Sequence, residues 1–218
     1  MKRVLLFAML LLGALCNTSH SAKAQGFKWG ARDGVTISNL IGIDNALPNA
    51  GFYVGVFAGY DFDSHWGLTL DMTHSEQGAL CRPNDDGVTM DYVYDYLNIP
   101  LMLEYGVELR GGHWVSLQAG VQAGIFLIGS YEYSAPSILG DDYVSGSGYL
   151  DSADFHPVDF GLSLGAEWCF GGYALELRYT LGITQTHDGI SNTLNGYYYI
   201  SVPDNRNSVF QVGTKFYF

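Results

Sequence analysis

Several carboxylates in this chain are placed where they could do acid–base chemistry. Two dipeptides stand out, Asp85-Asp86 and His187-Asp188, because histidine and carboxylates are the usual general acids and bases. A surface hydrolase or protease that uses these loop residues is one hypothesis, and acidic loops that are merely solvated are its competitor. The sequence has no Ser-His-Asp motif, glycine-rich phosphate loop, calcium-loop spacing or Cys/His metal spacing. We therefore expect no metal site and no cofactor.

A second group of charged residues lies in segments where polar and apolar residues alternate, on the polar face of each segment. Paired carboxylates again suit acid–base catalysis, but charges enclosed by protein must be paired in any case. We favour the second explanation, a structural ionic network, and expect no catalytic residue. The predicted network consists of Arg32, Asp71, Glu104, Glu167, Glu176, Arg178 and Lys215.

The stretches between these segments are rich in tyrosine, which offers a large contact area at little entropic cost. Two interpretations stand side by side: a binding surface on the loops, or strand extensions whose rings stack on one another. The residues are Tyr131, Tyr133, Tyr143, Tyr149, Tyr197, Tyr198 and Tyr199.

Eight segments of period two must position all of these residues, since successive strand side chains face opposite sides. In the clearest, Val115 to Leu127, Val, Leu, Ala and Ile alternate with Ser, Gln and Gly. The eight predicted strands are 27–38, 51–62, 66–76, 92–105, 115–127, 158–170, 173–184 and 208–218.

The composition of the two faces indicates which medium surrounds these strands. One face is bulky and apolar, and the other holds Gly, Ser, Thr and a few charges. Small and polar side chains fit the narrow interior of eight strands, whereas aromatic and branched ones suit lipid. Many segments also reach the roughly 9–11 residues that a tilted strand needs to cross a bilayer. We predict an all-β fold, an eight-stranded antiparallel up-and-down transmembrane β-barrel.

The first 24 residues have the pattern of a secretory signal peptide: Lys2-Arg3, a short apolar run, and the cleavage site Ala22-Lys23-Ala24. We expect residues 1–24 to be removed and residues 25–218 to form the barrel domain. Removal of three basic and no acidic residues takes the net charge from −12 to −15. So acidic a chain is a poor nucleic-acid binder, and we expect outer-membrane lipid as its surroundings.

The predicted connections alternate in length. Residues 61–65, 106–113 and 170–172 are short, whereas 39–50, 77–91, 128–157 and 185–207 are long. Outer-membrane barrels have short periplasmic turns and longer extracellular loops. We therefore expect the cell outer membrane, with long loops extracellular and both termini periplasmic.

Two cysteines, Cys81 and Cys169, remain after cleavage. The predicted topology places Cys81 in a long outer loop and Cys169 beside a short turn at the opposite end. About 25 Å of apolar band separates those levels, and a disulfide needs Cα atoms within about 7 Å. We expect both thiols to be free.

The last strand resembles the C-terminal signal by which bacterial outer-membrane barrels are recognised for insertion. Val212, Thr214, Phe216 and Phe218 alternate with polar residues. The positions that carry the resemblance are Gln211, Gly213, Phe216 and Phe218. The resemblance implies the barrel-assembly machinery as a partner.

The chain also resembles the PorT-like outer-membrane β-barrel proteins of Bacteroidota. The motifs are Gly30-Ala31-Arg32-Asp33-Gly34-Val35-Thr36-Ile37-Ser38-Asn39, the run Tyr96-Leu97-Asn98-Ile99-Pro100-Leu101, and the closing Phe. The resemblance implies an eight-stranded barrel over residues 25–218, and a link to envelope assembly or protein secretion. Asp33 departs from the small or apolar residue usual there, and a β-bulge would turn it inward.

We therefore expect a non-enzymatic outer-membrane barrel with a structural or interaction role through its acidic, Tyr-rich outer loops. An envelope or surface protein is the partner class that such loops suggest. The alternatives are the surface hydrolase above and a small-solute porin. The porin is disfavoured because side chains fill the interior of eight strands.

Overall fold

The computed structural model describes residues 26–43, 46–81, 87–136, 143–150, 155–186, 190–194, 198–202 and 205–218. The predicted signal peptide lies outside these residues. The described part forms β-strands connected by turns and short irregular segments, and no helix in it is long and apolar enough to cross a membrane. The strands are β1 (Gly26–Ile41), β2 (Ala46–Asp61), β3 (Trp66–Cys81), β4 (Thr89–Glu108), β5 (His113–Pro136), β6 (Tyr143–Leu150), β7 (Val158–Phe170), β8 (Tyr173–Gly182), β9 (Ile190–Leu194), β10 (Tyr198–Val202) and β11 (Arg206–Tyr217).

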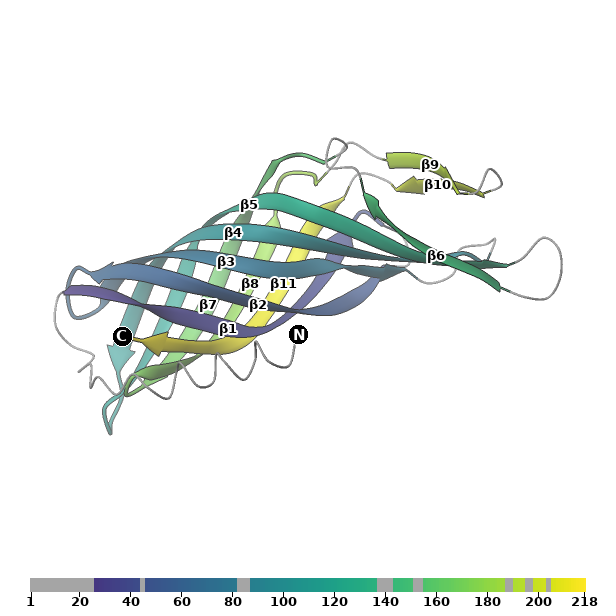
Figure 1. Ribbon diagram of the computed structural model, residues 1–218. Helices are drawn as coiled ribbons and strands as arrows, with labels where there is room; N and C mark the ends of the chain where they lie inside the picture. Colours follow the sequence, from purple (N-terminus) through teal and green to yellow (C-terminus); the bar gives the residue numbers. More distant parts are fainter. Residues whose placement is uncertain are drawn as a thin grey trace.

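Eight strands close a ring in the order β1, β2, β3, β4, β5, β7, β8 and β11 (Figure 1). β11 pairs with β1, from Gly30 opposite Tyr217 to Ile41 opposite Arg206, and so completes the barrel. Every pairing is antiparallel. The predicted fold, an all-β eight-stranded antiparallel barrel, is confirmed.

The predicted segments match these eight strands, but the strands are longer at one end. β3 continues to Cys81 and β4 begins at Thr89, inside a stretch expected to be a loop. β1 and β2 likewise leave four residues, 42–45, between them where a long loop was expected. β6, β9 and β10 were not predicted, because their Gly, Ser and Asn content hides the alternation. The ends of the barrel are called here the short-turn end, with the β2–β3, β4–β5 and β7–β8 connections, and the long-loop end.

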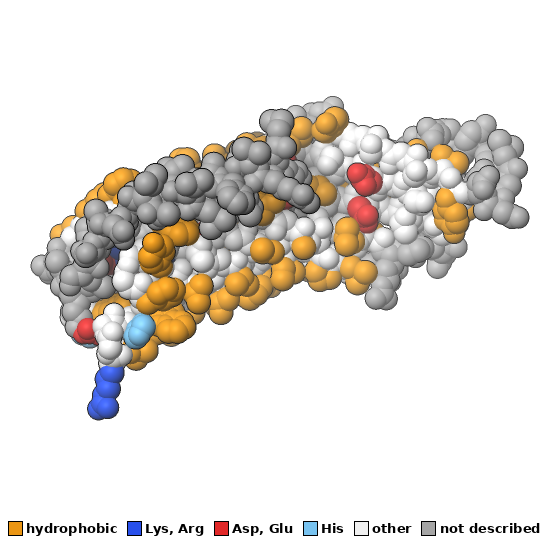
Figure 2. Space-filling model, turned by 60° about the horizontal axis from the view of Figure 1, so that its bottom comes forward, with side chains coloured by type: hydrophobic (Ala, Val, Ile, Leu, Met, Phe, Trp, Pro, Cys, Tyr) orange, Lys and Arg blue, Asp and Glu red, His pale blue; other side chains and the backbone are white. Residues whose placement is uncertain are grey.

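The barrel has an apolar outside and a polar inside. Leu117 and Leu164 are 65% and 63% exposed although they are strongly apolar, and Figure 2 shows hydrophobic side chains spread over the barrel surface. Arg32, Arg178 and Lys215 are among the largest fully buried side chains. This inversion of the usual globular arrangement is what a lipid-facing wall requires.

Asp33 does not turn inward, and the bulge suggested for it is absent. The β1–β11 register runs without a shift past Asp33, which is opposite Thr214. Strict alternation therefore keeps Asp33 on the outer face, half-buried. The Thr214 hydroxyl donates a hydrogen bond of 2.6 Å to the Asp33 Oδ1, which gives this carboxylate a donor without a change of side.

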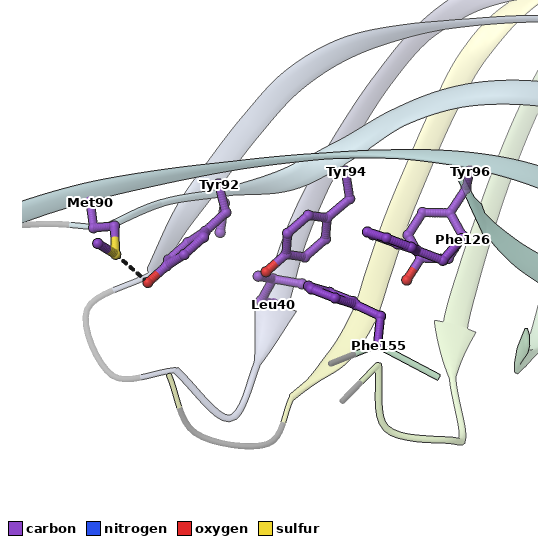
Figure 3. Packing of buried hydrophobic residues seen from close by; sticks show 8 residues of the cluster. Leu40, Met90, Tyr92, Tyr94, Tyr96, Phe126 and Phe155 are labelled. Carbon is purple, nitrogen blue, oxygen red and sulfur yellow. Dashed lines mark hydrogen bonds between the residues drawn. The ribbon is translucent and has the colours of Figure 1, made fainter. Parts of the chain in front are cut away.

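Beyond the barrel, β3, β4, β5 and β6 continue as a projecting sheet, here called the extension (Figure 1). A register shift separates it from the barrel, since Asp95 pairs with Ile128 and Tyr96 with Phe126. Its inner side packs an aromatic cluster at the long-loop end of the barrel. Figure 3 shows the cluster, made of Leu40, Ala79, Met90, Tyr92, Tyr94, Tyr96, Phe126 and Phe155.

Candidate functional site

The centre of the lumen holds two guanidinium groups and two carboxylates in mutual contact. Arg32 pairs with Asp71, and its Nη2 lies 2.5 Å from the Glu176 Oε1. The Arg178 Nη1 lies 2.7 Å from the Asp71 Oδ2, and its Nε 3.3 Å from the Glu176 Oε1. All four side chains are at most 1% exposed. Each charge therefore has two opposite charges beside it.

A lysine carries the network towards the short-turn end. The Lys215 Nζ lies 2.8 Å from the Glu167 Oε2 and 3.3 Å from the Glu176 Oε2. Glu167 and Glu176 are directly opposite in the β7–β8 pairing, as the tight turn at residues 171–172 predicts. Lys215, from the neighbouring strand β11, separates two carboxylates that would otherwise repel each other.

An amide connects this core to the seventh predicted residue, Glu104. The Gln118 Nε2 donates hydrogen bonds of 2.9 Å to both Glu104 and Glu167. The Lys28 Nζ lies 2.5 Å from Glu104 and 2.8 Å from Asp61 at the mouth. The structure thus brings all seven predicted lumen residues into one network, with Gln118 and Lys28 as further members. Both residues occupy alternating positions whose side chains face the lumen, and this pattern could have identified them from the sequence.

Aromatic rings from β2 seat the cations of the network. The Arg32 guanidinium carbon lies 4.9 Å from the centre of the Tyr53 ring, and the Lys215 Nζ lies 4.9 Å from the centre of the Phe57 ring. Tyr53 fits because Gly34 and Gly213 face each other across the β1–β11 seam. A Cβ at Gly213 would lie 2.1 Å from the Tyr53 hydroxyl. The glycine of the C-terminal motif therefore makes room for a ring that supports Arg32.

The network is balanced in charge and lies buried inside the barrel. Its directly paired core has three cations and three carboxylates, listed as Arg32, Arg178, Lys215, Asp71, Glu167 and Glu176. Each of these three carboxylates is buried and paired with at least one of the three cations. The arrangement suits a plug that holds the strands together.

A cavity of about 220 Å³ opens at the short-turn end below this plug. Lys28, Glu104, Trp114 and Tyr217 contribute to its lining. In the β2–β3 turn at its rim, the Asp63 Oδ1 accepts hydrogen bonds from the backbone N–H groups of Trp66, at 2.8 Å, and His65, at 2.7 Å. These two donors hold the pKa of Asp63 below its usual value.

The other residues of the C-terminal motif lie along the closing strand. Gln211 is buried in the lumen, opposite Thr36. Phe216 packs edge-on against Tyr173, with ring centres 5.6 Å apart. The Phe218 ring lies 5.1 Å from that of Trp29, and its N–H donates to the Trp29 carbonyl. The closing residues are thus fastened to the first strand at the short-turn end.

The tyrosines proposed for the loops fall into two groups. Tyr131 and Tyr133 of β5 point inward, are half-buried and stack with ring centres 6.4 Å apart. Tyr143 and Tyr149 of β6 are 68% and 78% exposed. Tyr198 and Tyr199 belong to β10, whose side chains are not described, and Tyr197 lies outside the described residues.

The residues of the hydrolase hypothesis, Asp85, Asp86, His187 and Asp188, all lie outside the described residues. Within the part of the chain that is described, no group of three or more His, Cys, Asp or Glu side chains could hold a metal ion. Cys81 and Cys169 are free thiols, as the topology predicts. Cys81 ends β3 and contacts the aromatic cluster rather than lying in a loop.

Comparison with known proteins gives a family and several solved structures that match the chain. No curated protein matches the chain. Ail, the attachment invasion locus protein of Yersinia pestis, is 15% identical over 89% of this chain and 100% of its own, with a TM-score of 0.43. OprG from Pseudomonas aeruginosa is 16% identical over 90% and 97%, with a TM-score of 0.46. Neisserial surface protein A is 14% identical over 88% and 97%, with a TM-score of 0.45.

The model of a family described as outer membrane protein β-barrel domain matches residues 19–188. That range covers most of the barrel strands described above. The protein therefore belongs to the outer membrane protein β-barrel domain family, and its place is the outer membrane.

Proposed function

We propose that this protein is a non-enzymatic outer-membrane barrel that is closed to solutes and acts through its long-loop end as a structural or interaction protein. The observation that carries the proposal is the ionic network across the lumen. An eight-stranded barrel leaves an interior just wide enough for side chains, and here Arg32, Arg178 and Lys215 occupy it in fixed ion pairs. A small-solute porin would need that space for water.

The proposed orientation has the long-loop end outside and both termini in the periplasm. The short connections at residues 62–65, 109–112 and 171–172 support it, because bacterial barrels place their short turns in the periplasm. The projecting extension supports it as well, since β5 continues far past the ends of β7 and β8. A projection of that kind offers contact area where partners can reach it.

The finer assignment is a PorT-like role as an accessory to envelope assembly or secretion. The first-strand and fourth-strand motifs support it, as does the terminal Phe218 packed on Trp29. The partners proposed are outer-membrane lipid along the apolar wall, the barrel-assembly machinery at β11, and an envelope or surface protein at the extension.

Conductance across a planar bilayer tests the closed lumen. Purified protein that shows the heat-modifiable gel mobility of a folded barrel should give no stable open level, while a known porin in the same bilayer does. A stable and sizeable conductance from the folded protein would contradict the closed barrel.

Cysteine labelling of intact cells tests the orientation. In a Cys81→Ala, Cys169→Ala background, Ser147→Cys on β6 should react with a membrane-impermeant maleimide. Arg110→Cys in the β4–β5 turn should react only after the outer membrane is opened. The reverse pattern would mean that the barrel is inserted the other way round.

A further inference from the structure

β6 is the edge strand of the extension. Among the described residues it pairs only with β5, from Gly129 opposite Leu150 to Pro136 opposite Tyr143, without a register shift. Its second edge carries a row of backbone N–H and C=O groups that can pair with another strand. Natural edges are usually protected by charges, prolines or bulges. β6, Tyr-Val-Ser-Gly-Ser-Gly-Tyr-Leu, has no charge, no proline and no bulge.

The inner side of β6 is fixed by its neighbour. A Cβ at Gly146 would lie 2.8 Å from the Tyr133 ring, and one at Gly148 would lie 2.7 Å from the Tyr131 hydroxyl. These rings therefore lie directly on the glycine backbone. The outer side carries Tyr143 and Tyr149, which are 68% and 78% exposed, with two exposed serines between them.

The sequence of β6 is nearly symmetric about Gly146, with Ser145 and Ser147 beside it and Tyr143 and Tyr149 three residues away on each side. We propose that β6 pairs antiparallel with β6 of a second copy of this chain, about a twofold axis at Gly146. Tyr143 then lies opposite the partner's Tyr149, and Ser145 opposite the partner's Ser147. Direct aromatic pairs and Ser pairs stabilise antiparallel strands, and a symmetric contact uses one surface twice.

The lack of charge within β6 also favours it over the outer face of the extension for a contact between two acidic chains. The outer face of the extension carries Asp91, which lies directly opposite Glu132, so a second copy is repelled there. In the proposed dimer, the two uncharged β6 strands lie between the β5 strands of the two copies. At about 4.8 Å per strand, Glu132 and the β5 acids of the other copy are about 14 Å apart, beyond the screening length of about 8 Å at physiological salt.

The direction of β6 decides which copies can meet. β6 runs from the tip of the extension at Tyr143 back towards the barrel at Leu150 (Figure 1). Two copies in one membrane are related by rotation about the membrane normal, which leaves both β6 strands running towards the membrane. They can then be antiparallel only if both strands are parallel to the membrane plane. A β6 strand that projects from the membrane therefore pairs with a copy in a facing membrane. The contact then joins two cells or two vesicles. This part of the inference rests on the outward direction of the long-loop end proposed above.

Disulfide trapping in detergent micelles tests the pairing without any membrane constraint. In the Cys81→Ala, Cys169→Ala background, Ser145→Cys protein is mixed with differently tagged Ser147→Cys protein and oxidised with copper phenanthroline. Antiparallel pairing brings residues 145 and 147 of the two copies to about 5 Å between Cβ atoms and leaves 145 and 145 about 7–8 Å apart on the diagonal. The mixed dimer should therefore exceed each self-dimer at least about fivefold, given the geometric limits of a disulfide.

A predominance of the Ser145→Cys self-dimer would mean parallel pairing and would overturn the proposal. Equal yields of all dimers, or no dimer, would overturn it as well. Heat-modifiable mobility of each variant shows that the barrel is folded, so that a failed crosslink reports on β6 alone.

Charge variants give a second test that needs no cysteine. The double variant Ser145→Lys, Ser147→Lys places lysine opposite lysine and should abolish the dimer, and so should Ser145→Glu, Ser147→Glu. A mixture of the two should restore it, because opposite charges then face each other. Ser64→Lys in the exposed β2–β3 turn is the matched control and should leave the dimer unchanged. Failure of the mixture to restore the dimer would overturn the predicted register.

Clustering of proteoliposomes tests the facing-membrane geometry. Two vesicle populations with different fluorescent lipids should cluster when both carry the natural chain, or when one carries the Lys pair and the other the Glu pair. Two Lys-pair populations should not cluster. Dimers in micelles without vesicle clustering would overturn the facing-membrane arrangement. Clustering together with the reversed maleimide pattern in cells would leave the β6 contact standing and overturn the proposed orientation instead.

Discussion

The barrel and the extension share the strands β3, β4 and β5 but differ in what their inner and outer faces carry. β4 passes through both. In the barrel its outer face is apolar and its inner face contains Asn98 and Glu104, both buried. In the extension its inner face holds the buried rings of Tyr92, Tyr94 and Tyr96, and its outer face carries two aspartates. The outer residues change from Leu97, Ile99, Leu101 and Leu103 in the barrel to Asp91, Val93 and Asp95 in the extension.

The difference shows that the surrounding medium, and not the strand itself, decides which side of a strand is apolar. Against hydrocarbon, apolar groups lie outside and buried charges must satisfy one another inside. Against water, the ordinary arrangement returns and the apolar groups form a core. The reversal lies between Leu97 and Asp95, where Asp95 also meets the His74 Nε2 at 3.3 Å. We infer that the boundary of the hydrocarbon at the long-loop end lies at this level.

The largest expected effect comes from Arg32 in the lumen. Arg32→Met leaves Asp71 and Glu176 to share the remaining cations, so one buried negative charge is unpaired. Loss of one partner of a buried ion pair costs about 3–5 kcal/mol. Urea unfolding of the barrel in lipid vesicles should show that the free energy of unfolding falls by that amount. Arg110→Met, in an exposed turn, is the control and should change the unfolding free energy little. If Arg32→Met changes it as little as Arg110→Met does, the ionic network does not stabilise the barrel.

Tyr94 tests the apolar core of the extension. Tyr94→Ala leaves a hole beside Phe126 and Phe155, whose rings lie 6.1 and 5.3 Å from that of Tyr94. Large aromatic truncations cost about 3–5 kcal/mol, and here the loss should be local. Hydrogen exchange should speed up in residues 89–95 and 129–135 while the barrel strands stay protected. Equal acceleration in β7 and β8 would show that the extension and the barrel are one cooperative unit.

A matched pair of arginine substitutions on the outer face of β4 should differ. Leu101→Arg places a charge in the lipid-facing band and should cost about 2–4 kcal/mol if it lies near the bilayer midplane. Val93→Arg has the same orientation in the extension, where water solvates it, and should cost little. The comparison of the two unfolding free energies is the measurement. A similar cost at both positions would place the extension inside the membrane.

The smallest effect is expected at the short-turn end. The pKa of Asp63 is lowered by the Trp66 and His65 N–H donors, so its contribution to stability is present above the unfolded-state pKa and lost as the pH falls through the folded-state value. Asp63→Asn should therefore change stability only slightly at neutral pH and remove this part of the acid dependence. Carbon-13 NMR titration of the Asp63 carboxyl group gives the direct check, and a pKa above the roughly 3.9 of an unperturbed aspartate would disprove the hydrogen-bond effect.

The barrel could be predicted from the sequence because its alternation has strong contrast. In β5, Val and Leu alternate with Gln and Gly for the length of a bilayer crossing, and the parity of each charge then places it in the lumen. The assignment of Glu167 opposite Glu176 follows from the short β7–β8 turn alone.

The remaining parts depend on contacts between strands that are far apart in the sequence. Gln118 connects Glu104 to Glu167 by hydrogen bonds that no local pattern shows. The extension has little hydrophobic contrast between its faces, since Gly and Tyr lie on the inner face and Ser and Tyr on the outer one, so β6 and residues 128–136 of β5 were taken for loop. Asp33 was expected to turn inward because its hydrogen-bond donor, Thr214, lies at the other end of the chain.

Spin labels along the outer face of β4 test the reversal most directly. Single cysteines at positions 91, 93, 95, 97, 99, 101 and 103 are labelled in the Cys81→Ala, Cys169→Ala background and reconstituted in liposomes. Collisions with oxygen, which concentrates in hydrocarbon, are compared with collisions with a water-soluble nickel complex. The ratio should be low from 91 to 95 and rise sharply from 97 to 103. A ratio that stays constant along the series would contradict the boundary between Asp95 and Leu97, and with it the explanation given for the two halves of this molecule.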